Sequence, residues 1–142
     1  MAHTLMYLSP YNYQLDAKQR LQQIQIAEDE ALCLLSLANS LTLNFYIRSK
    51  VSAHVSAFQF LELPAPDLKQ TARKKLAEFA TKLLKDPRDV KERAALEVFI
   101  ARELYGLSLD DWKHLTGTFT FGSGATKEEL DEIIRQSLTL WG

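Results

Sequence analysis

The chain has 142 residues, 46% hydrophobic and 25% charged, which is typical of a globular protein and predicts one domain over residues 1–142. The formal net charge of −1 gives no global sign of nucleic-acid binding, and the single cysteine, Cys33, excludes an internal disulfide and a cysteine-based zinc site. The sequence shows no signal peptide and nowhere approaches the roughly eighteen consecutive apolar residues of a membrane span, so we expect a cytoplasmic protein without membrane contact.

The first 28 residues form a weakly defined N-terminal segment. Residues 4–8 have the composition of a short strand, and Ser9-Pro10 is a turn signal after it. Residues 15–27 have weak helical periodicity, with Leu21 and Ile24 on one face.

The stretch from Ala31 to Pro66 has the clearest pattern in the chain. Apolar residues at helical spacing, spread over most of the circumference, predict a buried helix through residues 31–46. Asn39 interrupts this helix, and we expect its amide to be buried and hydrogen-bonded. Residues 55–63 then alternate as a short strand would, and Pro64 and Pro66 end it because proline has no backbone donor.

Four further helices are predicted after Pro66, and the first three lie between residues 67 and 116. Asp67 is a candidate N-cap for an amphipathic helix whose apolar face runs from Leu68 to Leu83. Asp86-Pro87 has the pattern of an N-cap and first helical residue for the next helix, which Gly106 would end. Ser108 with Asp111 predicts a capping box for a short helix to Thr116.

Thr126 with Glu129 predicts a second capping box and a C-terminal capped helix over residues 126–140. The fold class predicted from these patterns is mainly α, a helical domain with one or two short β-strands. Charge is uneven along it: residues 69–93 carry a net +5 between acidic ends of −2 (residues 1–47) and −4 (residues 94–142).

No pattern in the chain predicts a catalytic, cofactor or metal site. The loop Gly122–Gly124 resembles a nucleotide-binding glycine turn, but a strand and a following acidic partner are missing, so an ordinary loop explains it better. His3, His54 and His114 lie far apart and not at metal-ligand spacing. Cys33 lies in the apolar helix, where a structural thiol is expected.

Basic and small polar residues in the middle of the chain allow two interpretations. One is a solvated helix face and a simple loop; the other is a surface that contacts DNA phosphates and base edges. The candidate DNA-contacting residues are Arg48, Lys50, Ser52, His54, Lys69, Arg73 and Lys74.

Residues 29–66, DEALCLLSLANSLTLNFYIRSKVSAHVSAFQFLELPAP, resemble the C-terminal region of adenine-specific DNA methyltransferases of the single-chain (type IIG-like) restriction–modification and related phage-defence systems. The matching motifs are Ala38-Asn39-Ser40, Arg48-Ser49-Lys50-Val51, Phe58-Gln59-Phe60 and Leu63-Pro64-Ala65-Pro66. Residues 93–119, RAALEVFIARELYGLSLDDWKHLTGTF, are similar to the Leu-Tyr-Gly-Leu turn and short helix that close the same enzymes. The methylase-like region is therefore 29–119, although Ala53 and Glu62 stand where the family often has a glycine and a basic residue.

The family's Asn-Pro-Pro-Tyr type loop, which holds the flipped adenine, is absent from this sequence. The resemblance therefore implies a non-catalytic DNA-recognition or scaffold segment with no cofactor, partnered by DNA and possessing no enzyme activity of its own. The alternative is a helical interaction module that docks onto a methyltransferase or nuclease subunit. A small independent enzyme that uses the Gly122–Gly124 loop is a third, weaker hypothesis.

Overall fold

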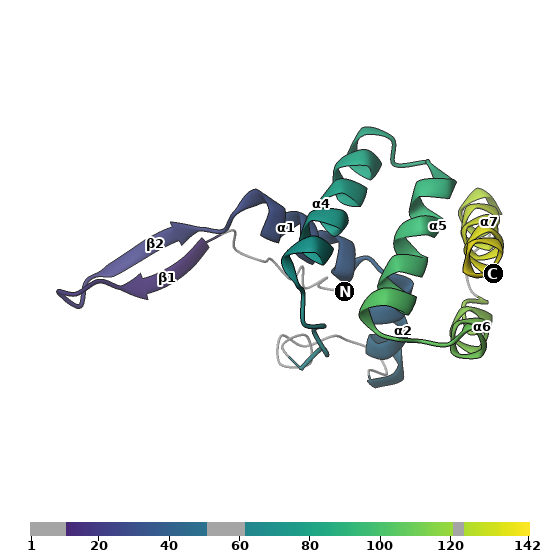
Figure 1. Cartoon of the computed structure of the whole chain (residues 1–142), viewed down its shortest axis with the longest axis horizontal. Coiled ribbons are helices and arrows are strands. Elements are labelled where there is room, and N and C mark those ends of the chain that lie inside the picture. Colours follow the sequence, from purple (N-terminus) through teal and green to yellow (C-terminus); the bar gives the residue numbers. More distant parts are fainter. Residues whose placement is uncertain (1–10, 51–61, 121–123) are drawn as a thin grey trace, which may run out of the picture.

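The computed structural model describes residues 11–50, 62–120 and 124–142, and it confirms a mainly helical fold with one two-stranded sheet (Figure 1). The predicted strand at residues 4–8 lies outside the described residues, as does nearly all of the one at 55–63. Helix α5 (Val90–Val98) lies between α4 (Gln70–Lys85) and α7 (Gly124–Trp141), and α1 (Glu28–Ala38) packs on the other side of α4.

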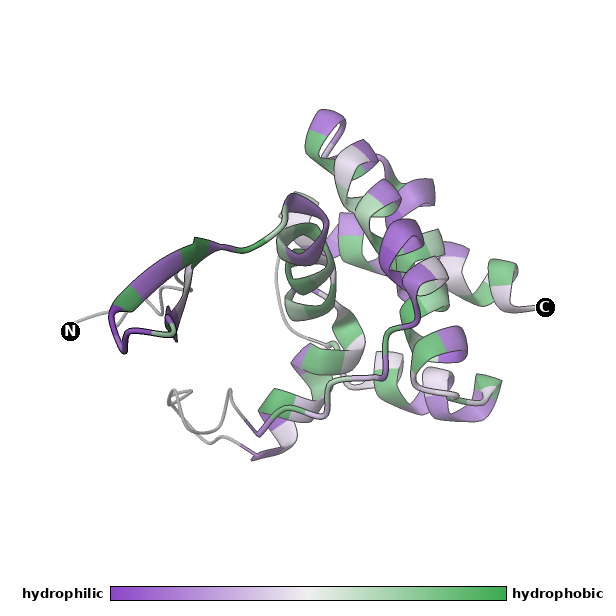
Figure 2. Ribbon diagram, turned by 60° about the vertical axis from the view of Figure 1, so that its left-hand side comes forward, coloured by the Kyte–Doolittle hydropathy of each residue, from purple (hydrophilic) through white to green (hydrophobic). Residues whose placement is uncertain are grey.

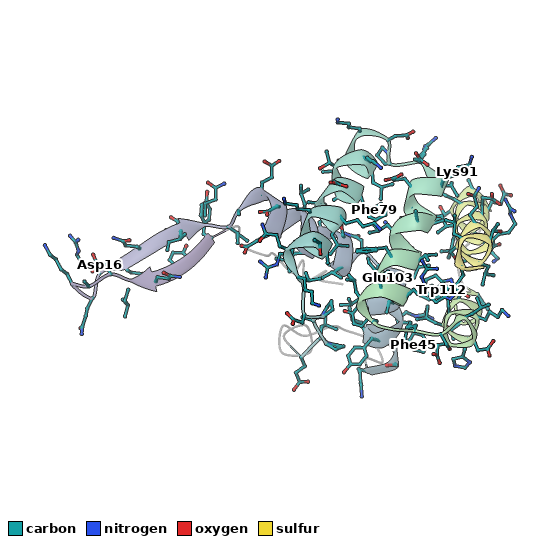
Figure 3. All side chains as sticks on the ribbon, in the orientation of Figure 1. Asp16, Phe45, Phe79, Lys91, Glu103 and Trp112 are labelled. Carbon is teal, nitrogen blue, oxygen red and sulfur yellow. The ribbon has the colours of Figure 1, made fainter. Side chains whose placement is uncertain are left out.

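The N-terminal segment is a β-hairpin that projects from the helical body, so the helix predicted over residues 15–27 is wrong. Strand β1 (Tyr11–Leu15) pairs antiparallel with β2 (Leu21–Gln25), with Leu15 opposite Leu21. Asp16 makes the turn, because its carboxylate accepts hydrogen bonds from the backbone N–H groups of Lys18 and Arg20. Figure 3 shows Asp16 at the far end of the hairpin.

The single buried helix predicted through residues 31–46 is two helices, α1 and α2 (Leu41–Lys50), bent by 60°. Ser40 makes the break, since its hydroxyl accepts from Leu43 N as an N-cap does and donates to Leu37 O. Asn39 is exposed, and its amide donates to Leu35 O, so its predicted burial is wrong. The burial predicted around α1 is wrong on one side as well, because Leu34 and Leu35 are exposed.

One hydrophobic core lies where α4 crosses α1 and α5. Its buried residues include Leu37, Leu76, Phe79, Leu96 and Ile100. Helix α1 begins with three acidic residues and is otherwise largely hydrophobic, as Figure 2 shows. Leu76 and Phe79 come from the middle of α4, and their burial confirms the centre of the apolar face predicted for this helix.

The predicted N-caps Asp67 and Asp86 are wrong by two and by three residues, respectively. Lys69 stands at the N-cap position of α4, without a side-chain hydrogen bond. The α5 N-cap is Asp89, whose carboxylate accepts from Glu92 N, whereas Asp86 accepts from Arg88 N in the preceding turn. Asp86 therefore belongs to a turn that precedes α5, whereas the backbone of Lys69 is extended where α4 begins.

The end of α5 widens into a π-helix, η1 (Phe99–Leu104), with Tyr105 N donating to Ile100 O. Gly106 follows with φ of 66°, as expected for a helix terminator. The predicted capping box of Ser108 and Asp111 is confirmed, and it begins α6 (Leu109–Gly117). The predicted Thr126 cap is wrong, because α7 begins two residues earlier, at Gly124.

A second core joins α2, η1, α6 and α7 around Trp112, which is fully buried. The Trp112 indole N–H donates to Ser137 Oγ at 2.9 Å, and its ring stacks on Trp141 with centroids 5.6 Å apart. The C-terminal helix is therefore held to the body by aromatic stacking and one buried hydrogen bond.

Candidate nucleic-acid interface and apolar pocket

The predicted DNA-contacting residues Arg48 and Lys50 lie in the last turn of α2, and both are exposed. The Arg48 guanidinium carbon is 5.2 Å from the centroid of the Phe119 ring, and Lys50 Nζ is 5.7 Å from that of Tyr46. Cations at a helix C-terminus also interact favourably with the helix dipole. Ser52 and His54, predicted beside them, lie outside the described residues.

Lys69, Arg73 and Lys74 lie at the beginning of α4, on a different element from Arg48 and Lys50. Arg73 is held within the chain, because its Nε donates to Leu68 O at 3.1 Å and its guanidinium lies 3.5 Å from a Glu30 carboxylate oxygen. Lys69 and Lys74 are exposed and make no ion pair with the described part of the chain. Of the three predicted contacts on α4, these two lysines are the better anion-binding groups.

Of the other cations of α4, Lys82 and Lys75 contact side chains of the chain itself, whereas Lys85 makes no ion pair in the described structure. Lys82 pairs with Glu92 at 2.7 Å, and Lys75 Nζ lies 4.5 Å from the centroid of the Phe99 ring. Lys85 is exposed and has no ion pair among residues 11–50, 62–120 and 124–142. We call Lys69, Lys74 and Lys85 the basic surface of α4.

Helix α7, on the far side of α5 from α4, has the opposite charge (Figure 1). It carries four acidic residues, and its two cations are engaged within the helix, Lys127 with Asp131 and Arg135 with Glu132. The hydrogen bond from Arg135 lowers the pKa of Glu132 to about 2. An anionic ligand would therefore meet the α4 side of the molecule rather than the α7 side.

A buried ion pair, which the sequence patterns did not reveal, holds the break between α1 and α2. Glu97 is completely buried; one carboxylate oxygen accepts from Leu41 N at 2.9 Å and the other from Arg93 Nε at 3.0 Å. Arg93 also donates to the backbone carbonyl of Asn39. Burial raises the pKa of Glu97, although the Arg93 charge opposes that rise. We call these four residues the interhelical seam.

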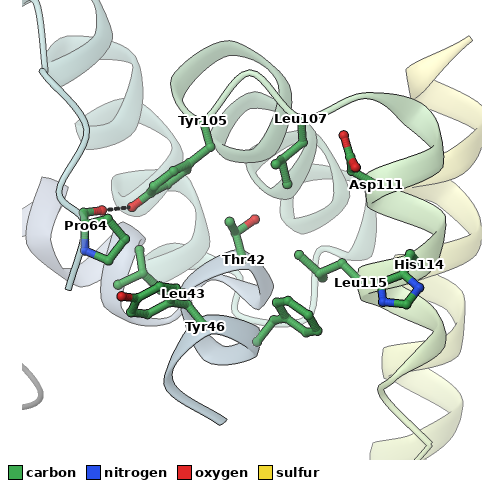
Figure 4. A pocket seen from close by; sticks show the side chains of 10 residues that line it. Thr42, Leu43, Tyr46, Pro64, Tyr105, Leu107, Asp111, His114 and Leu115 are labelled. Carbon is green, nitrogen blue, oxygen red and sulfur yellow. Dashed lines mark hydrogen bonds between the residues drawn. The ribbon is translucent and has the colours of Figure 1, made fainter. Parts of the chain in front are cut away.

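The second feature absent from the predictions is an apolar pocket of about 340 Å³ (Figure 4). Its wall is fixed by Tyr105, whose hydroxyl donates to Pro64 O at 2.7 Å and whose pKa is raised by burial to about 12. The lining comes from α2, Pro64, the turn after η1 and α6: Thr42, Leu43, Phe45, Tyr46, Pro64, Tyr105, Leu107, Asp111, His114 and Leu115. The sequence signal closest to it is Leu-Tyr-Gly-Leu at residues 104–107, which predicts a helix end and resembles a methylase motif but does not indicate a pocket.

The remaining polar candidates that the structure describes are a thiol on α1 and an imidazole on α6. Cys33 is buried, its thiol donates to Arg73 O at 3.1 Å, and burial raises its pKa, as expected for a structural thiol. His114 is exposed, with its ring in edge contact with Phe45; His3 lies outside the described residues, as do Gly122 and Ser123 of the glycine loop. Among the described residues no group of three or more His, Cys, Asp or Glu side chains could hold a metal ion.

No single helix in the described ranges is both long and apolar enough to cross a membrane; α1 and α2 together have the length and composition, but they are bent by 60°. No protein-family model matches the chain, and comparisons with curated proteins and with solved structures give no match.

Proposed function

We propose that this chain is a non-catalytic DNA-recognition and scaffold segment of a DNA-modification system, similar in role to the C-terminal region of adenine-specific DNA methyltransferases. The observation that carries the proposal is the way the two methylase-like stretches of the sequence fold onto each other. Tyr105, in the Leu-Tyr-Gly-Leu turn of the second stretch, bonds to Pro64, in the Leu-Pro-Ala-Pro exit of the first.

Two further contacts join the same stretches at other motifs. Arg93 and Glu97, from the second stretch, hold the backbone of Asn39 and Leu41 at the Ala-Asn-Ser motif of the first. Arg48, from the Arg-Ser-Lys-Val motif, lies over the ring of Phe119, the last residue of the second. The hydrogen bonds from Arg93 and Tyr105 join residues that lie 54 and 41 positions apart in the sequence, so local interactions do not bring them together. These contacts support one structural unit that contains both stretches.

The DNA role in this proposal rests on exposed cations at the end of α2 and the beginning of α4. Arg48 and Lys50 end α2 directly before Ser52 and His54, and Lys69 and Lys74 begin α4 shortly after the Pro64–Pro66 exit. Such cations neutralise phosphates and release counterions, which gives binding without sequence preference. Arg73 contributes less than predicted from the sequence, because Glu30 and Leu68 hold it.

A titration of the full chain with a DNA duplex at several salt concentrations tests the proposal. If three or four phosphates are neutralised, log affinity falls with log salt at a slope of about −3 to −4, since each phosphate contributes roughly −0.9. The double variant Arg48→Ala/Lys50→Ala should lower the magnitude of that slope by about 2.

The matched control is Lys113→Ala/Lys127→Ala, which removes the same charge from lysines paired with Asp110 and Asp131. We expect the control to keep the slope of the unmodified chain. Absence of binding even near 20 mM salt, a low ionic strength at which surface charges are little screened, would overturn the DNA role. If both double variants reduce the salt slope of DNA binding equally, the binding depends on the net charge of the chain and not on Arg48 and Lys50.

The chain alone should neither bind a methyl donor nor methylate adenine, because its sequence lacks the adenine-binding tetrapeptide of the methylases. Calorimetry with S-adenosylmethionine and a radiolabel transfer assay check this. Transfer that survives purification would show that the chain is an enzyme in its own right.

A further inference from the structure

The apolar pocket is lined by a residue whose buried hydroxyl has no hydrogen-bond partner among the described residues. Thr42 is 8% exposed, and its Oγ1 is buried and makes no hydrogen bond within the described chain. Figure 4 shows the Thr42 side chain rising into the middle of the lining residues. An unpaired buried polar group costs about 1–3 kcal/mol, so a hydroxyl in this position is suited to a ligand that supplies the missing hydrogen bond.

The lack of a partner follows from the position of Thr42 in its helix. Helical threonines commonly donate to the carbonyl four residues earlier, as Thr81 does to Ala77 and Thr116 to Trp112. Thr42 is the second residue of α2, and residue 38 belongs to α1 on the other side of the 60° bend. The bend therefore removes the usual acceptor.

Aromatic rings form much of the pocket wall. Phe45, Tyr46, Tyr105 and His114 line it, and Tyr105 is fixed by its bond to Pro64. The π-helix η1 ends next to Tyr105, and π-helical turns occur preferentially at functional sites. A volume of about 340 Å³ is near the lower end for ligand pockets, a size suited to one aromatic group.

The mouth of the pocket includes the carboxylate of Asp111. Hydrogen bonds from the Ser108 hydroxyl and backbone N–H to one of its oxygens lower the pKa of Asp111, so the group is anionic at neutral pH. It is exposed and followed one turn later by His114. A cation next to the bound group would be attracted here, and a phosphate would be repelled.

We propose that this pocket binds a tyrosine or tryptophan side chain of a partner protein, with a basic residue beside it facing Asp111. The aromatic body fills the apolar walls, and its O–H or N–H group bonds to Thr42 Oγ1. Buried aromatic anchors of this kind dominate protein interfaces. A nucleobase fits less well, because its several polar edge atoms would face a lining with one unpaired buried hydroxyl.

Side-chain analogues provide a direct test by ¹H–¹⁵N NMR titration of the full chain. p-Cresol and toluene differ only by the hydroxyl, and both should shift the resonances of the lining residues. We expect p-cresol to bind about 2- to 10-fold more tightly, the fold-change of one net hydrogen bond. In Thr42→Val that preference should disappear while the affinity for toluene stays the same.

Thr81→Val is the matched control, since it removes a hydroxyl from the exposed side of α4, away from the pocket. It should keep the full preference for p-cresol. Thr42→Val removes a hydroxyl that has no partner in the described chain, so we expect an unchanged or higher Tm, which also verifies that the variant folds.

Tyramine, which adds an ammonium group to the phenol, tests the role of Asp111. It should bind more tightly than p-cresol at low salt, and Asp111→Asn or high salt should remove that gain. No shift of the lining resonances with any analogue would overturn the proposal, and so would a p-cresol preference that survives in Thr42→Val. Tighter binding of adenosine monophosphate than of p-cresol would assign the pocket to a nucleotide instead. The DNA titration with the Arg48 and Lys50 variants tests the proposed DNA role separately from this pocket, because neither residue lines the pocket.

Discussion

The interhelical seam and the basic surface of α4 both depend on charged residues, but they use them in opposite ways. In the seam, the Glu97 carboxylate is buried and both of its oxygens accept hydrogen bonds. On the basic surface, Lys69, Lys74 and Lys85 are exposed and make no ion pair within the described residues. Substitutions in the seam should therefore change folding stability, and those on the surface should change only binding.

Charged residues therefore have two different roles in this chain: some satisfy buried backbone groups, and others remain exposed to solvent. Glu97 lies in an apolar segment and is needed to satisfy backbone groups at the α1–α2 bend. The lysines lie in a basic run and make no ion pair with the part of the chain that the structure describes. A buried charge that loses its partners is costly, whereas an exposed charge is screened by water and salt.

The largest effect is expected for Arg93→Ala, which would leave the Glu97 carboxylate buried without its cation. Breaking one side of a buried ion pair typically costs about 3–5 kcal/mol in the free energy of unfolding. Urea denaturation followed by circular dichroism measures this loss. Arg135→Ala, which removes a cation from an exposed pair on α7, should cost less than about 1 kcal/mol. Equal losses in the two variants would contradict the difference between seam and surface.

A smaller loss is expected where a neutral buried hydrogen bond is broken. Ser137→Ala leaves the Trp112 indole N–H without its acceptor, at a cost of about 1–3 kcal/mol. Thermal unfolding measures it, and Ser49→Ala, which removes an exposed hydroxyl bonded to Tyr46 O, is the control. A Tm for Ser137→Ala equal to that of the control would show that the buried bond adds nothing.

The seam should also make stability depend on pH. Because burial raises the pKa of Glu97 in the folded state, the folded protein binds a proton there more strongly than the unfolded chain does. Its contribution is complete below the ordinary pKa of about 4.3 and is lost as the pH rises through the folded pKa, with a slope of at most about 1.4 kcal/mol per pH unit.

Urea midpoints measured upward from pH 4.5 check this dependence, and Glu97→Gln should flatten it. The pKa of Glu132, lowered to about 2, acts in the other direction, because its contribution is lost as the pH falls from about 4.3 through 2. Unchanged pH dependence in Glu97→Gln would show that Glu97 does not titrate with a raised pKa.

The smallest effect on stability is expected for Lys69→Ala/Lys74→Ala, within about 0.5 kcal/mol, because neither lysine has an ion pair to lose in the described chain. The same variant should reduce the salt slope of DNA binding by about 2 if both lysines meet phosphates. Parallel urea denaturation and DNA titration separate the two quantities. A large loss of stability would show that these lysines contribute to folding, as the seam residues do.

Local sequence patterns predicted the elements whose causes are local. The capping box of Ser108 and Asp111 needs residues only three positions apart, and Gly106 ends its helix through its own backbone conformation. The apolar spacing of residues 68–83 likewise identified the face of α4 that is buried. The hairpin was missed because its strands bury little, with Tyr13, Leu15 and Leu21 exposed, so that hydrophobic alternation is weak there.

The sequence by itself determined where most helices lie and that the domain is mainly helical, because helix periodicity and caps are interactions over three or four residues. Only the tertiary structure decided that Asn39 is exposed, that Glu97 is buried and that α1 and α2 bend apart at Ser40. It also brought Thr42, Pro64, Tyr105 and Asp111 to one pocket. The seam and the pocket join residues about 40 to 70 positions apart, and their energies arise from burial and hydrogen bonding that no local pattern records.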